Sequence, residues 1–212
     1  MVFRRRKPLS IWSKLREAVY PAAGFRRSGL YLLHRMRRLP DPPHRIARGI
    51  WAGVFVSFTP FFGLHFALAA LIALILRGNV VAALLATAVG NPLTFPVIAV
   101  LSVDLGHRIL NTGVEGVPAS QILPAFAYAS AEFWDNLVAT FTSDPTHWDR
   151  MRYFFRGLFL PYLVGGIAPG VIAATLGYYL SLPMISAYQR LRQARRRARA
   201  ETRAAPPPGD DP

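Results

Sequence analysis

The chain has 212 residues, a formal net charge of +14 and no cysteine. This length allows one domain with extensions, and the lack of cysteine excludes disulfides, thiolate metal sites and cysteine nucleophiles. Hydrophobic residues make up 52% of the chain and charged residues 17%, and of the 25 Lys and Arg residues 13 precede Gly49 and seven follow Tyr188. Such segregation excludes a soluble globule whose surface is built from the middle of the chain.

The basic N-terminal region, residues 1–43, predicts two short amphipathic helices. Ser10–Tyr20 and Ser28–Leu39 each place apolar side chains on one helix face and basic side chains on the other, and each is followed by a proline,. These helices either lie in the headgroup layer with their arginines toward anionic phospholipids, or pack on each other or on the rest of the domain. Nucleic acid is not favoured as a partner, because lipid contacts explain basic clusters beside apolar spans.

Three uncharged blocks indicate a membrane protein: Gly49–Leu76, Val80–Val103 and Gly157–Tyr188, with 28, 24 and 32 residues. A helix crosses the hydrocarbon core of a bilayer with about 20 apolar residues. We therefore predict an all-α integral membrane bundle with broken or re-entrant helices over residues 44–190. A basic helix and a disordered tail should follow over residues 191–212. The first two blocks, separated only by Arg77-Gly78-Asn79, predict a helical hairpin embedded in the membrane.

The first block is interrupted at Phe58-Thr59-Pro60-Phe61-Phe62-Gly63. Pro60 removes a backbone donor and clashes with the carbonyl four residues back, and groups freed in hydrocarbon need partners within the protein. Thr59 can return a hydroxyl to the backbone, and Gly63 permits close approach of another helix. The break predicts either a proline kink or a discontinuous helix whose ends form a polar site. His65 is an ionisable group within this run, and it either belongs to a functional site or serves as a neutral interhelical hydrogen-bond partner.

The second block is interrupted at Gly90-Asn91-Pro92-Leu93-Thr94-Phe95-Pro96. A residue that precedes proline is disfavoured in helical geometry, and the Asn91 amide supplies both a donor and an acceptor to orphaned backbone groups. Gly90, Asn91, Pro92 and Thr94 therefore join Thr59, Pro60, Gly63 and His65 as candidates for a functional polar site.

Asp104 completes this set of candidates, near the aqueous end of the helix that follows the second break. Asp104 and His107 fall on one helix face, but no third ligand lies at a suitable spacing for a metal. We therefore expect no metal and no other cofactor.

The segment 104–156 is rich in aromatic residues and moderately polar, which is typical of a membrane interface. The third block, residues 157–188, is interrupted by Gly165-Gly166-Ile167-Ala168-Pro169-Gly170. Beyond Tyr188, a basic surface helix is expected to continue through Arg199.

The run from Arg45 to Leu110 resembles a known family. The resemblance rests on Gly53, Pro60-x-x-Gly63-x-His65, Asn79, Asn91-Pro92-x-Thr94 and Gly106. This pattern is similar to a bacterial membrane-domain family catalogued as domain of unknown function 2062, and residues 157–188 are expected to belong to the same domain. The resemblance implies a bacterial inner-membrane helical protein without an established activity.

Two classes of function remain. No phosphate-binding glycine loop, nucleophile elbow or His-Glu-x-x-His motif occurs, so we do not expect an enzyme. The first class is a small transport or lipid- and envelope-handling protein that uses broken helices near Thr59, His65 and Asn91. The second is a structural membrane scaffold whose basic tails bind anionic lipids or protein partners. A homo-oligomer is compatible with both classes.

The basic residues also predict a topology. Clusters at both ends of the chain place both termini in the cytoplasm, so the number of full crossings is even and one of the three blocks enters and leaves on the same side. We expect the third block to be re-entrant at Gly165–Gly170, because only Arg77 then lies outside. In the alternative, the second block is re-entrant at Asn91-Pro92, and the segment 104–156 lies outside.

Overall fold

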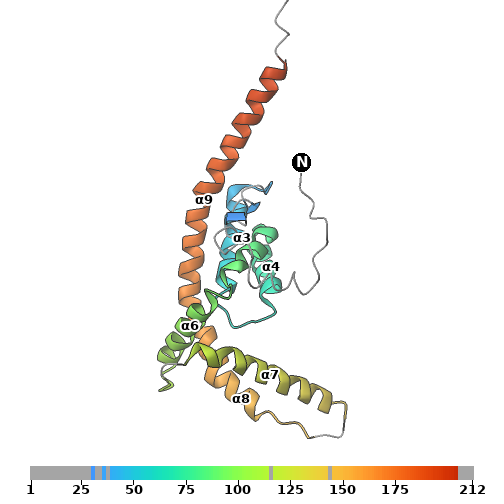
Figure 1. Cartoon of the computed structure of the whole chain (residues 1–212), viewed down its shortest axis with the longest axis vertical. Helices are drawn as coiled ribbons and strands as arrows, with labels where there is room; N and C mark the ends of the chain where they lie inside the picture. The colour runs from blue at the N-terminus through green and yellow to red at the C-terminus, as the bar shows by residue number, and fades with distance from the viewer. Residues whose placement is uncertain (1–29, 32–34, 37–38, 115–116, 143–144, 205–212) are drawn as a thin grey trace, which may run out of the picture.

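A computed structural model describes residues 30–31, 35–36, 39–114, 117–142 and 145–204 (Figure 1). Every regular element assigned in this part of the chain is helical, which confirms the all-α class. The elements are α3 (Pro43–Val56), α4 (His65–Ile75), α5 (Val80–Ala86), the 3-10 turn η1 (Thr87–Val89), α6 (Phe95–Ile109), α7 (Ala119–Ala139), α8 (Asp149–Phe154), the π-helical turn η2 (Phe155–Phe159) and α9 (Leu160–Ala204). The amphipathic helix expected at Ser10–Tyr20 and the tail from residue 205 lie outside the described residues.

The first apolar block is a discontinuous helix that folds back on itself, and it is not a kinked span. Helix α3 ends at Val56 and α4 begins at His65. Buried alanines of the two helices pack together along their length, and the Asn79 amide after α4 donates to the Arg45 carbonyl near the start of α3 at 2.8 Å. Of the two forms expected for this break, the discontinuous helix is therefore the one present. Pro60 lacks an N–H to continue the helix, and Gly63 adopts a φ of 83°, a left-handed conformation that glycine tolerates,.

The second block begins with a helix that runs parallel to α3. A Cβ on Gly49 would lie 2.2 Å from the Asn79 carbonyl oxygen, and one on Gly53 would lie 2.2 Å from that of Ala83. Small residues spaced by four therefore bring α3 and α5 into backbone contact, the pattern by which helices pack closely in membranes. Asn79 caps α5 by accepting from the Ala82 amide at 2.6 Å. The chain then breaks again between Val89 and Phe95.

The third block forms one continuous helix, so its predicted re-entrant turn at Gly165–Gly170 is wrong. Helix α9 runs through this motif with Pro169 inside it. Its glycines allow close contact with other helices and do not form a turn. A Cβ on Gly165 would lie 2.0 Å from the Ser102 carbonyl oxygen, and a Cβ on Gly166 would lie 2.1 Å from the Phe58 carbonyl oxygen. The expected continuation of the helix past Tyr188 is confirmed.

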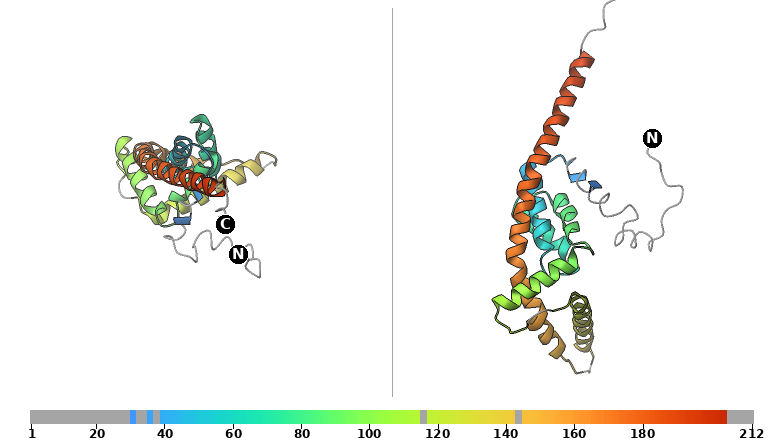
Figure 2. Two further views of the ribbon diagram at one scale, coloured as in Figure 1. Left: turned by 90° about the horizontal axis from the view of Figure 1, so that it is seen from above. Right: turned by 60° about the vertical axis from the view of Figure 1, so that its left-hand side comes forward.

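Helix α9 is the axis of the molecule (Figures 1 and 2). Helices α3, α4 and α5 lie beside its middle part, α6 crosses it, and α7 and α8 lie at the end away from the C-terminus. Within the described residues, one helical segment, Asp149–Arg195, is long and apolar enough to cross a membrane by length and composition. The segment 104–156 thus contains the end of α6 and a pair of helices, α7 and α8.

Candidate functional site

The first break brings two of the predicted residues together. Thr59 is buried, and its hydroxyl donates to the Val56 carbonyl at 2.7 Å. The His65 Nε2 atom lies 3.3 Å from the Thr59 carbonyl oxygen, close enough to donate a hydrogen bond when it carries the proton. Pro60 is buried beside them, whereas Gly63 is exposed at the turn. The Thr59 hydroxyl therefore adds a second donor to the Val56 carbonyl, which the Thr59 amide already reaches at 2.9 Å, and His65 offers a donor to the Thr59 carbonyl.

The second break is stabilised by its own polar side chains. The Asn91 side-chain oxygen accepts from the amides of Leu93 at 2.8 Å and Thr94 at 3.2 Å, and its side-chain nitrogen donates to the Ala88 carbonyl at 3.2 Å. The Thr94 hydroxyl accepts from the Asn91 amide at 3.2 Å and donates to the Val89 carbonyl. Pro92 lies exposed within this turn. The direction in which α6 leaves the break is thus fixed by Asn91 and Thr94.

The two breaks lie next to each other. The Ser57 hydroxyl reaches the Thr87 carbonyl at 3.3 Å, and a Cβ on Gly90 would lie 3.2 Å from that of Ser57. On the other side, the Phe62 ring meets the Phe95 ring edge to face at 5.1 Å between centroids. The hydrogen bonds found for Thr59 and Asn91 stay within their own breaks. The breaks are therefore joined through Ser57 and Phe62 and not through a shared polar centre.

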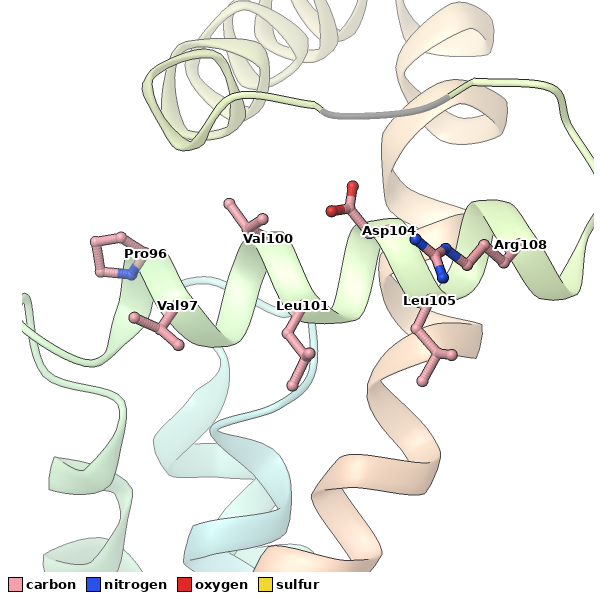
Figure 3. A pocket seen from close by; sticks show the side chains of 7 residues that line it. All are labelled: Pro96, Val97, Val100, Leu101, Asp104, Leu105 and Arg108. Carbon is pink, nitrogen blue, oxygen red and sulfur yellow. The ribbon is translucent and has the colours of Figure 1, made fainter.

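Asp104 lies away from the breaks, in a groove along α6 (Figure 3). The groove has a volume of about 660 Å³ and begins at Pro96, directly after the second break. Its lining is Pro96, Val97, Val100, Leu101, Asp104, Leu105 and Arg108. One Asp104 carboxylate oxygen, Oδ1, is buried and has no hydrogen-bond partner among the described residues. No group of three or more metal-ligating side chains was found in that part of the chain, and the His107 Nδ1 atom pairs with the Thr112 hydroxyl at 2.6 Å.

A second groove, of about 890 Å³, lies between α7 and α8 and was not anticipated from the sequence. Apolar and aromatic side chains such as Val117, Tyr128 and Phe154 line most of it, and Asp149 and Arg150 add an acidic and a basic group. The π-helical turn η2 contributes Gly157 and Leu158 to its wall. Turns of this kind are frequent at functional sites. The many aromatic residues in this stretch were the feature of the sequence that could have predicted the groove.

A polar cluster at the other end of the bundle was also missed by sequence reasoning. The Asp41 carboxylate accepts from Arg45 Nη1 at 2.9 Å and from the Asn79 side-chain amide, and its backbone carbonyl accepts from Gln189 Nε2 at 2.9 Å. Nearby, His44 Nδ1 lies 2.9 Å from the Tyr178 hydroxyl. The starts of α3 and α5 are therefore fastened to α9 at one end of the molecule.

The sequence of this chain matches a described protein family. A family described as an uncharacterized protein conserved in bacteria, DUF2062, matches residues 26–194. The chain belongs to this family. The comparisons with curated proteins and with solved structures found no match.

Proposed function

We propose that the chain is a multi-pass protein of a bacterial inner membrane, with both termini in the cytoplasm, that handles a lipid or another small envelope molecule. Apolar side chains that face outward support the membrane part of this proposal. Phe66 and Ile75 on α4 are 62% and 70% exposed, and Ile172 and Leu180 on α9 are 62% and 67% exposed. Large exposed apolar surfaces mark contact with a partner or a membrane.

The dimensions of the bundle support the same placement. Gln189 contacts the polar cluster at Asp41, and Pro161 contacts α6 at Gly106. These two levels are 28 positions apart on α9, or about 42 Å at the helical rise of about 1.5 Å per residue. A bilayer with its headgroup regions is about 40–45 Å thick. The polar cluster and α6 would then lie at opposite interfaces, with the backs of α3, α4 and α5 in hydrocarbon.

The observation that carries lipid handling is the chemical character of the two grooves. Both are lined mainly by apolar side chains, and each contains an acidic and a basic residue, Asp104 with Arg108 and Asp149 with Arg150. A phospholipid has the same two parts, an apolar chain and a charged headgroup. The broken helices near Thr59, His65 and Asn91 would act by holding α6, and hence the first groove, at a fixed angle to α9.

Lipid movement between leaflets tests this proposal. The purified chain is reconstituted into liposomes that contain a phospholipid labelled on its acyl chain, and an impermeant reductant bleaches the label in the outer leaflet. We expect the protein to raise the bleached fraction above that of empty liposomes. Asn91→Ala should lower this gain, because it frees the Leu93 and Thr94 amides. Leu93→Ala, at an exposed position in the same turn, is the matched control. Equal bleaching with and without wild-type protein would refute lipid movement.

A structural scaffold is the second candidate, and the local hydrogen bonds of the breaks favour it. The hydrogen bonds found for Thr59 and Asn91 go to backbone groups of their own breaks, as expected of residues that only stabilise a fold. The basic residues that follow Tyr188 would then bind anionic headgroups or protein partners,. This candidate predicts that the protein binds anionic liposomes more strongly than neutral ones and moves no lipid.

A further inference from the structure

We propose that the groove along α6 is a binding site for one phospholipid with a primary-ammonium headgroup. The ammonium would pair with Asp104, the phosphate with Arg108, and an acyl chain would lie over Val97 and Leu101. The inference deepens the proposed function and rests on its membrane placement. It concerns binding alone, and lipid movement is not needed for it.

The spacing of the two charged residues fits such a headgroup. Asp104 and Arg108 are four positions apart on one helix, so their side chains project from the same face, as Figure 3 shows. In Figure 3 the aliphatic side chains of Val97 and Leu101 extend to the other side of α6 from the Asp104 carboxylate. They line the same groove and are 69% and 52% exposed. The groove thus offers a charged end and an apolar track.

The Asp104 carboxylate can accept from a ligand in the groove through one of its oxygens. Its Oδ1 atom is buried among the protein's own atoms and is closed to a ligand, so the contact would fall to Oδ2. A primary ammonium would supply both a positive charge and N–H donors to that atom. Arg108 is exposed at the same end of the groove, and a guanidinium binds phosphate through two parallel hydrogen bonds.

The level of the groove within the bilayer agrees with a headgroup. Helix α6 touches α9 closely at Gly106, where a Cβ would lie 1.7 Å from the Pro161 carbonyl oxygen. This contact is about 42 Å along α9 from Gln189, at the helical rise of about 1.5 Å per residue. If the basic end of the bundle lies in the cytoplasmic headgroup layer, Asp104 lies in the opposite one, within reach of outer-leaflet lipids.

The acidic residue selects among headgroups. An anionic phosphatidylglycerol would bring a second negative charge to Asp104 without a cation to offset it. A phosphatidylcholine carries a positive charge but no N–H group to donate to the carboxylate. Phosphatidylethanolamine has the ammonium, the donors and the phosphate, and so fits the pair of Asp104 and Arg108 best.

Lipid retention by the purified full chain tests the inference. The protein in detergent is titrated separately with dioleoyl phosphatidylethanolamine, phosphatidylcholine and phosphatidylglycerol, and bound lipids are counted by native mass spectrometry. We expect tightest retention of phosphatidylethanolamine. Asp104→Asn should weaken that affinity about tenfold, the size of one lost charge-assisted hydrogen bond, and should reduce the preference over phosphatidylcholine. Arg108→Gln should weaken retention of all three lipids.

Asp135→Asn, at an exposed position on α7 outside both grooves, is the matched control and should leave this retention unchanged. Equal binding of phosphatidylethanolamine and phosphatidylcholine by the wild type would overturn the inference without any variant, as would tighter binding of phosphatidylglycerol. An unchanged affinity in Asp104→Asn would also overturn it. Selective retention by a protein that moves no lipid in liposomes would refute lipid movement and leave this site standing.

Discussion

The Asn79 side chain donates a hydrogen bond to the Asp41 carboxylate, although the two residues are far apart in the sequence and neither lies inside a helix. Through its other oxygen, Asp41 accepts from Arg45, and its backbone carbonyl accepts from Gln189. Asn79 in turn caps α5 and donates its own amide to the Arg45 carbonyl. A single residue therefore joins three helices at the basic end of the bundle: Asp41 contacts the starts of α3 and α5 through its carboxylate and α9 through its backbone carbonyl.

Replacement of this carboxylate should destabilise the protein. Asp41→Ala removes the acceptor of both Arg45 and Asn79 and leaves a buried side-chain amide without its partner. We expect a loss of about 1–3 kcal/mol in the free energy of unfolding, measured by tryptophan fluorescence during denaturation in detergent. Asp135→Ala, at an exposed position on α7, should change it by less than about 0.5 kcal/mol. Equal stabilities of the two variants would contradict this role of Asp41.

The contact between α6 and α9 should tolerate no side chain at Gly106. A Cβ there would lie 1.7 Å from the Pro161 carbonyl oxygen, so Gly106→Ala must push the two backbones apart. Overpacking of this kind costs about 1–3 kcal/mol or more, and a lower unfolding temperature in detergent would reveal it. Gly157→Ala is the control, because nothing lies within 4 Å of a Cβ at that position. A Gly106→Ala protein as stable as this control would mean that α6 does not meet α9 here.

The first break should depend on the Thr59 hydroxyl. Thr59→Val keeps the shape of the side chain but removes the hydroxyl that donates to the Val56 carbonyl at 2.7 Å, so that this carbonyl keeps only the Thr59 amide, at 2.9 Å. We expect a loss of about 0.5–1.5 kcal/mol in the free energy of unfolding, the contribution of one buried hydrogen bond. Thr140→Val removes a similar hydrogen bond, 2.9 Å to the Asn136 carbonyl, at an exposed position where water can replace it. Similar effects of both substitutions on stability would show that the break is hydrated.

The sequence predicted the helical class, the place of the breaks in the first two blocks and the helix beyond Tyr188, because prolines and uncharged runs act locally. It did not predict the reversal at Pro60. A proline interrupts a helix in the same way whether the chain bends or turns back, and the outcome here depends on contacts with distant residues. Gly49 and Gly53 leave room for α5, and Asn79 fastens the returning chain to Arg45.

The turn predicted in the third block was wrong for a related reason. Gly165-Gly166 followed by Pro169 has the composition of a turn, yet the structure uses both glycines for close approach to Ser102 and Phe58. A glycine needed for space and a glycine needed for a turn look alike in one sequence. The candidate site was affected similarly. The sequence identified Asp104, but it did not predict the groove that Asp104 lines, because this groove depends on which side of α6 the rest of the chain leaves uncovered.

The arrangement of the blocks leads to a revised topology. If α9 crosses once and the first block turns back at Pro60, Arg77 lies at the same end as Gln189, whereas α7 and α8 lie at the other end. Only Arg108, Arg150, Arg152 and Arg156 of the 25 Lys and Arg residues then lie outside, which still satisfies the preference for basic residues in the cytoplasm. In this proposed arrangement the second block and α9 would provide the two crossings, and both termini would stay in the cytoplasm.

Labelling of single cysteines tests this topology directly, because the chain has no native cysteine. Ser120→Cys lies at an exposed position on α7, Arg77→Cys at an exposed turn, and Thr202→Cys near the end of α9. In intact cells, an impermeant maleimide should label Ser120→Cys alone, and the other two should react only after the membrane is opened. Labelling of Arg77→Cys alone would instead mean that the first block crosses the membrane. Labelling of Thr202→Cys in intact cells would refute an even number of crossings, because the basic C-terminal part of α9 would then lie outside.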